Sequence, residues 1–221
     1  MRQNAAEAVI WDFNGTIVDD LDLVVRSVNV QPGERGLSTL TVEGYRDVFG
    51  FPVETYYRRI GLDLDAESMA GLSTEFFDLY VPGLADCPLH AGVHKALKRF
   101  KARGARQFVL SAMEETLLRS TIDHLEIGGF FDAVYGLAHL EADSKVSRGR
   151  QLLADHDIRP ETTLLIGDTD HDAEVADALG VSTVLIAQGH QSEERLRATG
   201  RPVYRSVPGW VRVDGVGDAH S

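Results

Sequence analysis

Four short apolar runs along the chain each lead into a polar residue or a glycine. The runs cover residues 8–11, 107–110, 163–166 and 183–186. Continuous apolar runs of this length are typical of buried strands in a parallel sheet, because both faces of such a sheet are covered. The residues that follow the runs are Asp12, Ser111, Gly167-Asp168 and Gln188-Gly189. We therefore expect polar side chains to gather at the carboxyl ends of the strands.

An amphipathic helix is predicted at residues 91–103. The apolar residues Val93, Ala96, Leu97 and Phe100 recur there at helical spacing, whereas the basic residues lie off that stripe. Strands that alternate with helices indicate the α/β class, here a Rossmann-like parallel sheet covered by helices. Ligands of such sheets bind beyond the carboxyl ends of the strands, which makes the polar run ends the candidate site.

Residues 19–85 carry helix-start signals in place of strand-like runs. Thr41 and Asp65 are candidate N-caps, and Pro52 is a candidate first-turn residue. The clearest helical pattern covers residues 65–81. Its larger apolar side chains, which fall roughly on one side, are Met69, Leu72, Phe76, Phe77 and Tyr80. The pattern predicts a small all-helical segment between the first and second strands.

This helical segment sets the expected domain boundaries. We predict a core domain made of residues 1–18 and 86–211, with a small helical domain inserted at residues 19–85. Residues 212–221 are short, glycine-containing and weakly apolar, so we expect a mobile tail there.

Composition narrows the possible partners and the compartment. The chain has 221 residues, 43% of them hydrophobic, and a formal net charge of −12, which disfavours nucleic acid and anionic membrane surfaces as partners. Cys87 is the only cysteine, so an internal disulfide and a multi-cysteine zinc site are both excluded. The first apolar run is far too short for a signal or membrane segment. A cytoplasmic location is expected, whereas the oligomeric state cannot be predicted from these features.

The chemistry-bearing residues form a set suited to phosphate chemistry on a metal. Asp12 follows the first run, Ser111 follows the second, Lys145 comes later, and residues 168–172 hold three carboxylates after the third run. A carboxylate can act as a nucleophile toward phosphorus. Mg²⁺ prefers oxygen ligands and is often held by one or two carboxylates, while lysine and hydroxyl groups bind phosphoryl oxygens.

The order of these residues resembles the four motifs of the haloacid dehalogenase superfamily. The motif residues are Asp12-Phe13-Asn14-Gly15-Thr16, Ser111, Lys145 and Gly167-Asp168-Thr169-Asp170-His171-Asp172. Residues 88–92, Pro-Leu-His-Ala-Gly, also look like the re-entry from a helical cap in the phosphoglycolate phosphatase-like branch. The resemblance spans most of the chain. It implies a Mg²⁺-dependent hydrolase that acts on a small phosphorylated metabolite beneath the cap.

The resemblance also implies a role for each motif residue. Asp12 would attack phosphorus and form an aspartyl-phosphate. Phosphate would be bound by Gly15, Thr16, Ser111 and Lys145. The residues placed at the Mg²⁺ ion would be Asp12, Asn14 through its backbone carbonyl, Asp168 and, through waters or through Asp168 itself, Asp172.

Asn14 departs from the phosphatase pattern of this family, in which an aspartate at that position acts as general acid and base. Asparagine keeps the backbone carbonyl but cannot exchange a proton near neutral pH. Three interpretations stay open. The first is a phosphatase that acts on esters with good leaving groups or uses Asp19, Asp20 or His171 as proton carrier. The others are a phosphoryl transferase and a non-catalytic protein that binds phosphorylated metabolites. General acid–base help is typically worth roughly 10²- to 10⁴-fold in rate.

Two of the motif residues have alternative interpretations. Ser111 has the residue type of an N-cap for a helix that includes residues 114–122, a role that it could combine with phosphate binding. Lys145 lacks the proline that often follows it in the family, and Arg148 lies close enough to be mistaken for it. The three-dimensional arrangement has to decide between them.

Overall fold

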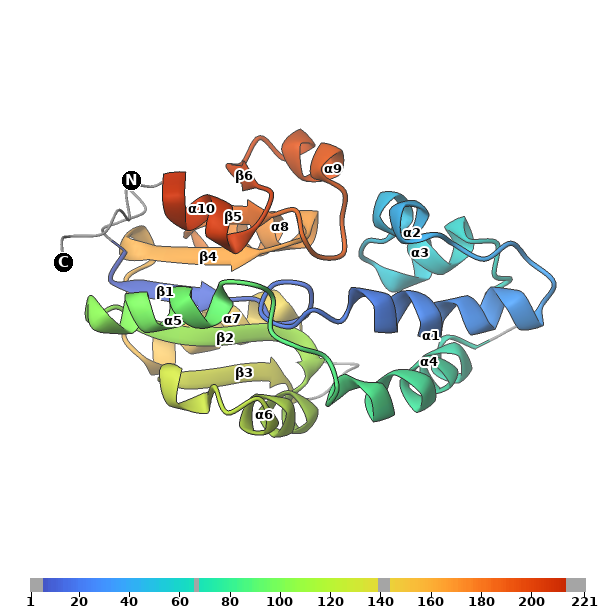
Figure 1. Cartoon of the computed structure of the whole chain (residues 1–221), viewed down its shortest axis with the longest axis horizontal. Helices are drawn as coiled ribbons and strands as arrows, with labels where there is room; N and C mark the ends of the chain where they lie inside the picture. The colour runs from blue at the N-terminus through green and yellow to red at the C-terminus, as the bar shows by residue number, and fades with distance from the viewer. Residues whose placement is uncertain (1–5, 66–67, 139–143, 214–221) are drawn as a thin grey trace.

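A six-stranded parallel sheet forms the centre of the computed structural model, which describes residues 6–65, 68–138 and 144–213 (Figure 1). The strand order is β3-β2-β1-β4-β5-β6. The strands are β1 Ala8–Trp11, β2 Arg106–Glu114, β3 Ala133–Leu137, β4 Thr163–Gly167, β5 Ser182–Ile186 and β6 Val203–Tyr204. Ala8 of β1 pairs with Arg106 on one side and with Thr163 on the other. The first strand is therefore central, and Asp12 emerges from the middle of the sheet edge.

Two hydrophobic cores cover the two faces of the sheet. On one face, Trp11 packs edge-on against Phe100 and Trp210. On the other face, Ile10 belongs to a cluster that includes Val175 and Leu179. The helices outside the 19–85 segment are α5 Val93–Ala102, α6 Glu115–His124, α7 Lys145–Asp155, α8 Asp170–Leu179, α9 Glu193–Ala198 and α10 Val207–Val213, with short 3-10 turns at Gly128–Phe130 and Pro160–Thr162. The α/β class is confirmed.

A group of helices lies beyond the carboxyl ends of the strands, at the right of Figure 1. These are α1 Leu21–Glu34, α2 Val42–Val48, α3 Val53–Arg59 and α4 Met69–Leu84. We call this group the cap, as defined by residues 21–84. Its α1 and α4 pack against each other, and Gln31 of α1 donates a hydrogen bond to the Leu72 carbonyl of α4 at 2.6 Å. The exact division of the chain into two domains stays a prediction.

Several sequence-based expectations were inaccurate in detail. The pattern missed β3, which is interrupted by Gly136, and β6, which has only two residues, and it predicted too early an end for β2. The helix after residue 65 begins at Met69, because Ser68 caps it by accepting a hydrogen bond from the Gly71 amide; Asp65 does not cap it. Thr41 does cap α2 as predicted, and Pro52 directly precedes α3. Of the predicted tail, residues 212–213 belong to α10, and residues 214–221 lie outside the described residues.

Within the described residues, the helices are all too short or too polar to cross a membrane.

Candidate active site

Asp12 is positioned by the strand that precedes it and by a tight turn that follows it. The Asp12 amide donates to the Ile166 carbonyl of β4 at 2.8 Å, so the sheet ladder continues up to this residue. The Gly15 amide then donates to the Val18 carbonyl at 3.0 Å, which closes the turn. Gly15 has a left-handed backbone with φ of +71°, a conformation that glycine adopts without steric cost. The Asp12 carboxylate is buried at the sheet edge, as the sequence predicts.

Lys145 joins two of the predicted site residues. It is the first residue of α7, and its ammonium group donates to the Asp12 carboxylate and to Asp172 Oδ1, the latter at 2.6 Å. Arg148, the alternative to Lys145, instead donates to the Gly136 carbonyl at 2.7 Å and pairs with Glu115, away from Asp12. The structure therefore selects Lys145 as the cation beside Asp12.

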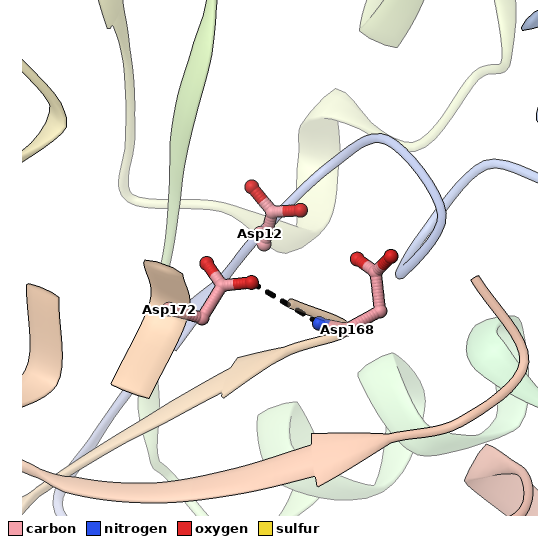
Figure 2. Close-up of side chains that lie close together, drawn as sticks. All are labelled: Asp12, Asp168 and Asp172. Atoms are coloured by element: carbon pink, nitrogen blue, oxygen red, sulfur yellow. Dashed lines mark hydrogen bonds between the residues drawn. The ribbon is translucent and has the colours of Figure 1, made fainter. Parts of the chain in front are cut away.

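Asp168 and Asp172 complete an acidic cluster with Asp12 (Figure 2). One carboxylate oxygen from each of the three lies within 4.8 Å of the others. Asp172 Oδ2 accepts from the Asp168 amide at 3.2 Å and from the Thr169 hydroxyl at 2.8 Å. The Thr169 hydroxyl in turn accepts from the Asp172 amide in the capping box that starts α8. The start of α8 therefore fixes Asp168 and Asp172 next to Asp12.

Thr16 and a histidine from another loop hold Asp168. The Thr16 hydroxyl donates to Asp168 Oδ1 at 2.7 Å, and the His190 amide donates to Oδ2 at 2.7 Å. In this structure the Thr16 side chain is thus engaged with the acidic cluster. Its predicted role in phosphate binding stays a prediction.

Ser111 is buried within β2, on the strand next to β1. Its hydroxyl accepts a hydrogen bond from the Met113 amide at 3.1 Å. The interpretation of Ser111 as a helix N-cap is wrong, because Glu114 caps α6 by accepting from the Thr116 and Leu117 amides, each at 2.8 Å. Ser111 thus lies at the carboxyl side of the sheet with its hydroxyl bonded to the backbone of its own strand. Phosphate binding by Ser111 stays a prediction.

Asn14 lies against a buried aspartate and a tyrosine of the cap. Its amide nitrogen donates to Asp20 Oδ2 at 2.8 Å and to the Tyr80 hydroxyl at 2.7 Å. Of the three proton-carrier candidates, only Asp20 contacts Asn14 among the contacts that the structure records. Asp19 pairs with His90 at 3.6 Å, and His171 pairs with Glu174 at 3.0 Å.

His190 and two cap tyrosines were not identified by the sequence patterns as site residues. His190 Nε2 lies 3.2 Å from Asp20 Oδ1, and its Nδ1 lies 3.3 Å from the hydroxyl of Tyr45 in α2. Tyr80, which the pattern assigned to the cap core, reaches Asn14. His190 follows β5 by four residues, so its position beyond a strand end was the available signal.

Hydrogen bonds to backbone carbonyls hold the cap against the loop that follows β5. Arg46 of α2 donates to the Gly189 carbonyl at 2.8 Å and to the Gln188 carbonyl at 2.7 Å. Gln191 returns a hydrogen bond to the Phe49 carbonyl of the cap at 3.2 Å. The loop after β5 therefore joins the cap to the acidic cluster.

Negative charge exceeds positive charge in this buried region. The buried carboxyl groups are those of Asp12, Asp20, Asp168 and Asp172. Within the described part of the chain, the buried cations that contact them are Lys145 and His190. Burial raises the pKa of Asp12 well above its ordinary value, against the opposing charge of Lys145, and also raises the pKa of Asp168. A divalent cation would supply the missing positive charge.

Neighbouring opposite charges shift the pKa values of His190 and Asp172 toward their charged forms. Burial alone would lower the pKa of His190, but the Asp20 carboxylate beside it raises that pKa to about 9. Burial would likewise raise the pKa of Asp172, but the charge and hydrogen bond of Lys145 hold it below its ordinary value. Asp172 is therefore ionised and paired, while Asp12 and Asp168 are the carboxylates that gain most from an added cation.

We expect Gly15→Ala to disrupt the acidic cluster. An added Cβ would lie 2.4 Å from Asp168 Oδ2 and 2.6 Å from Cδ2 of His190, besides the strain of a left-handed alanine. The free energy of unfolding should fall by about 2–4 kcal/mol, measured by urea denaturation. The matched control is Gly36→Ala, because Gly36 has φ of +70° with no atom within 4 Å of an added Cβ. Its loss should be only about 1–2 kcal/mol. Equal losses in the two variants would show that the site is not crowded at Gly15.

Comparisons with known proteins place the chain in one family and show which relatives and solved structures it resembles. A family model described as haloacid dehalogenase-like hydrolase matches residues 9–186. A phosphoglycolate phosphatase of Caulobacter vibrioides is 29% identical over 196 residues, covering 84% of this chain and 81% of the relative. Tyrosine-protein kinase PtkA of Mycobacterium tuberculosis is 26% identical over 185 residues, covering 83% of this chain and 63% of the kinase. The crystal structure of a predicted phosphatase from Clostridium acetobutylicum superposes with a TM-score of 0.80 at 18% identity, covering 94% and 97% of the two chains, which shows the shared fold.

Proposed function

The chain belongs to the haloacid dehalogenase-like hydrolases, and we propose that it is a Mg²⁺-dependent phosphatase of small phosphomonoesters that acts through Asp12. One observation carries the proposal. The Asp12 carboxylate sits at the end of the central strand, bonded to the buried Lys145 and clustered with Asp168 and Asp172. The phosphoglycolate phosphatase relative supports a phosphomonoester as the substrate class.

The donor set of the acidic cluster fits a Mg²⁺ ion. Asp12 and Asp168 offer carboxylate oxygens in a region where negative charge exceeds positive charge, and Asn14 follows Asp12 closely enough to offer its backbone carbonyl. Asp172 is already bonded to Lys145 and Thr169, so it would orient the surroundings of the ion. When bound, the ion would neutralise phosphoryl oxygens and align the phosphate with Asp12.

In the proposed reaction, a carboxylate oxygen of Asp12 attacks phosphorus while the bond from phosphorus to the ester oxygen breaks. The ester oxygen leaves as an alkoxide that takes a proton from solvent water, and the phosphoryl group stays on Asp12 as an acyl phosphate. A water molecule then attacks the same phosphorus, and inorganic phosphate leaves as the Asp12 carboxylate is restored. Lys145, held at Asp12, neutralises negative charge at the transferring group. Asn14 cannot supply the proton, so we infer that turnover is slow for esters with poor leaving groups.

A second candidate function is phosphoryl transfer to an acceptor other than water. The same loss of a proton-exchanging group at Asn14 would slow attack by water on the acyl phosphate. The similarity to tyrosine-protein kinase PtkA favours this candidate, because that relative is named for phosphoryl transfer. The two candidates share the first step on Asp12 and differ in the second.

A phosphate-release assay tests both candidates. The protein should release phosphate from p-nitrophenyl phosphate, phosphoglycolate or glycerol 2-phosphate with Mg²⁺ present and should lose this activity in EDTA. With p-nitrophenyl phosphate, equal amounts of nitrophenol and phosphate indicate hydrolysis. An excess of nitrophenol over phosphate when a tyrosine peptide or an alcohol is added indicates transfer. Mg²⁺-dependent binding of phosphoglycolate without nitrophenol or phosphate release would contradict both candidates and identify a non-catalytic binding protein.

A further inference from the structure

The Asp20 carboxylate is the meeting point of three segments of the chain. Its Oδ1 accepts from the Gly15 amide at 3.0 Å and lies 3.2 Å from His190 Nε2. Its Oδ2 accepts from the Asn14 amide nitrogen at 2.8 Å and from the Tyr80 hydroxyl at 2.7 Å. The side chain is fully buried, and both oxygens have two donors each. This one group therefore ties together the turn after Asp12, the loop after β5 and the cap helix α4.

These contacts fix which way the Asn14 side chain points. The Asn14 nitrogen gives its two hydrogens to Asp20 and Tyr80, whose hydroxyl itself donates to Asp20. The three groups form a closed triangle of hydrogen bonds in which the amide is the only group with protons for both partners. The remaining polar atom of the Asn14 side chain, the amide oxygen, is consequently turned away from this triangle.

A carboxylate in place of the Asn14 amide would lose this arrangement. Aspartate at position 14 would bring a second acceptor-only group against Asp20 Oδ2, where the structure now has a donor at 2.8 Å. The Tyr80 hydroxyl has a single proton and can serve only one of the two carboxylates. Like charges at such a distance repel strongly in a buried region. An amide at position 14 is thus complementary to a carboxylate at position 20.

We propose that Asp20 is a positioning residue that orients the Asn14 side chain and couples it to the cap through Tyr80. The amide at position 14 and the carboxylate at position 20 then act as a matched pair of hydrogen-bond donor and acceptor. This inference rests on the proposed function only for its kinetic consequence. An aspartate introduced at position 14 should then raise kcat only when the carboxylate at position 20 is replaced as well. Because Tyr80 belongs to α4, the orientation of residue 14 depends on the cap being in place.

The test is a double-mutant cycle of wild type, Asn14→Asp, Asp20→Asn and the double variant. Thermal unfolding and the kcat and KM for glycerol 2-phosphate, an ester with a poor leaving group, are measured for all four proteins with saturating Mg²⁺. Asp22→Asn is the matched control, because Asp22 is exposed on α1 and its substitution removes the same charge as Asp20→Asn. Asp12→Asn in the wild-type background tests the proposed function separately.

We expect each single variant to unfold at a lower temperature than wild type and the double variant to regain most of that loss. Asp20→Asn should lower kcat about 10- to 100-fold with a much smaller change in KM, since misorientation affects the reacting geometry more than binding. Asn14→Asp alone should not raise kcat, whereas the double variant should exceed wild type by at least about tenfold, within the range of general acid–base catalysis.

Two results would overturn the inference. One is an Asn14→Asp variant that equals the double variant in kcat, and the other is a double variant whose loss of thermal stability is the sum of the single losses. Activity that persists in Asp12→Asn would instead reject the proposed function, and the unfolding cycle would still decide whether residues 14 and 20 are paired.

Discussion

Replacing Lys145 with methionine should both destabilise the protein and abolish its phosphatase activity. Methionine fills most of the volume of the lysine stem but leaves Asp12 and Asp172 without their shared cation. Removing one partner of a buried ion pair typically costs about 3–5 kcal/mol, because the remaining charges stay buried and uncompensated. Here a single substitution removes the partner of two carboxylates.

Urea denaturation in EDTA and in Mg²⁺ measures the effect on stability. The free energy of unfolding of Lys145→Met should fall by about 3–5 kcal/mol in EDTA. Mg²⁺ should restore part of this loss, because an ion bound by the folded state stabilises it by mass action. The control, Lys95→Met, removes the same charge from an exposed position on α5 and should stay within about 0.5 kcal/mol of wild type. A loss below about 1 kcal/mol for Lys145→Met would mean that this cation is not needed to hold the acidic cluster.

The sheet was predictable from sequence where a strand centres on an uninterrupted run of large apolar residues. The central strands β1, β4 and β5 are buried along nearly their whole length, so continuous hydrophobicity identified them. By contrast, β3 contains Gly136, and β6 has two half-buried residues, so neither gives a continuous apolar run. Edge strands gain their conformation from pairing with a neighbour, and the pattern of the strand itself carries little of that information.

The candidate site was predictable to the extent that its residues follow strand ends. Asp12 and Asp168 come directly after β1 and β4, and the parallel register alone brings them together. Tyr80 lies 60 residues from Asp20, on a helix whose spacing indicated only a buried face. Contacts of this kind depend on how the cap packs over the sheet edge, which local sequence does not specify. The same limit explains why the pairing of Asn14 with Asp20 was visible only in three dimensions.

The N-caps of the helices were likewise predictable from the sequence only in part. Thr41 was identified as an N-cap because a hydroxyl precedes a helical pattern, and its side chain does accept from the Gly44 amide at 3.0 Å. Ser111 has the same residue type and follows a strand, yet β2 continues past it to Glu114. Pairing with β3 extends to Glu114, opposite Leu137, after a shift of register. The long-range pairing of β2 outweighs the local capping preference of serine there.

Asp12→Asn should remove the proposed nucleophile while leaving the rest of the site in place. Asparagine has nearly the same shape, and its side-chain oxygen can still accept a hydrogen bond from Lys145, as the carboxylate does in the structure. An amide oxygen is a far weaker nucleophile than a carboxylate, so kcat/KM for p-nitrophenyl phosphate should fall by about 10⁴-fold or more. Stability should be retained, because the substitution removes one negative charge from a buried cluster that already holds an excess of carboxylates.

A binding measurement distinguishes the proposed nucleophile from the groups proposed to hold phosphate. We expect Asp12→Asn to bind inorganic phosphate in the presence of Mg²⁺ by isothermal titration, with an affinity equal to or above that of wild type, because one charge that repels the phosphate is gone. The control Asp78→Asn, at an exposed position on α4, should keep wild-type kinetics. Since Asp12 is the carboxylate that the structure places against Lys145 at the end of the central strand, more than about 1% residual Mg²⁺-dependent activity in Asp12→Asn would mean that phosphorus is attacked by another group.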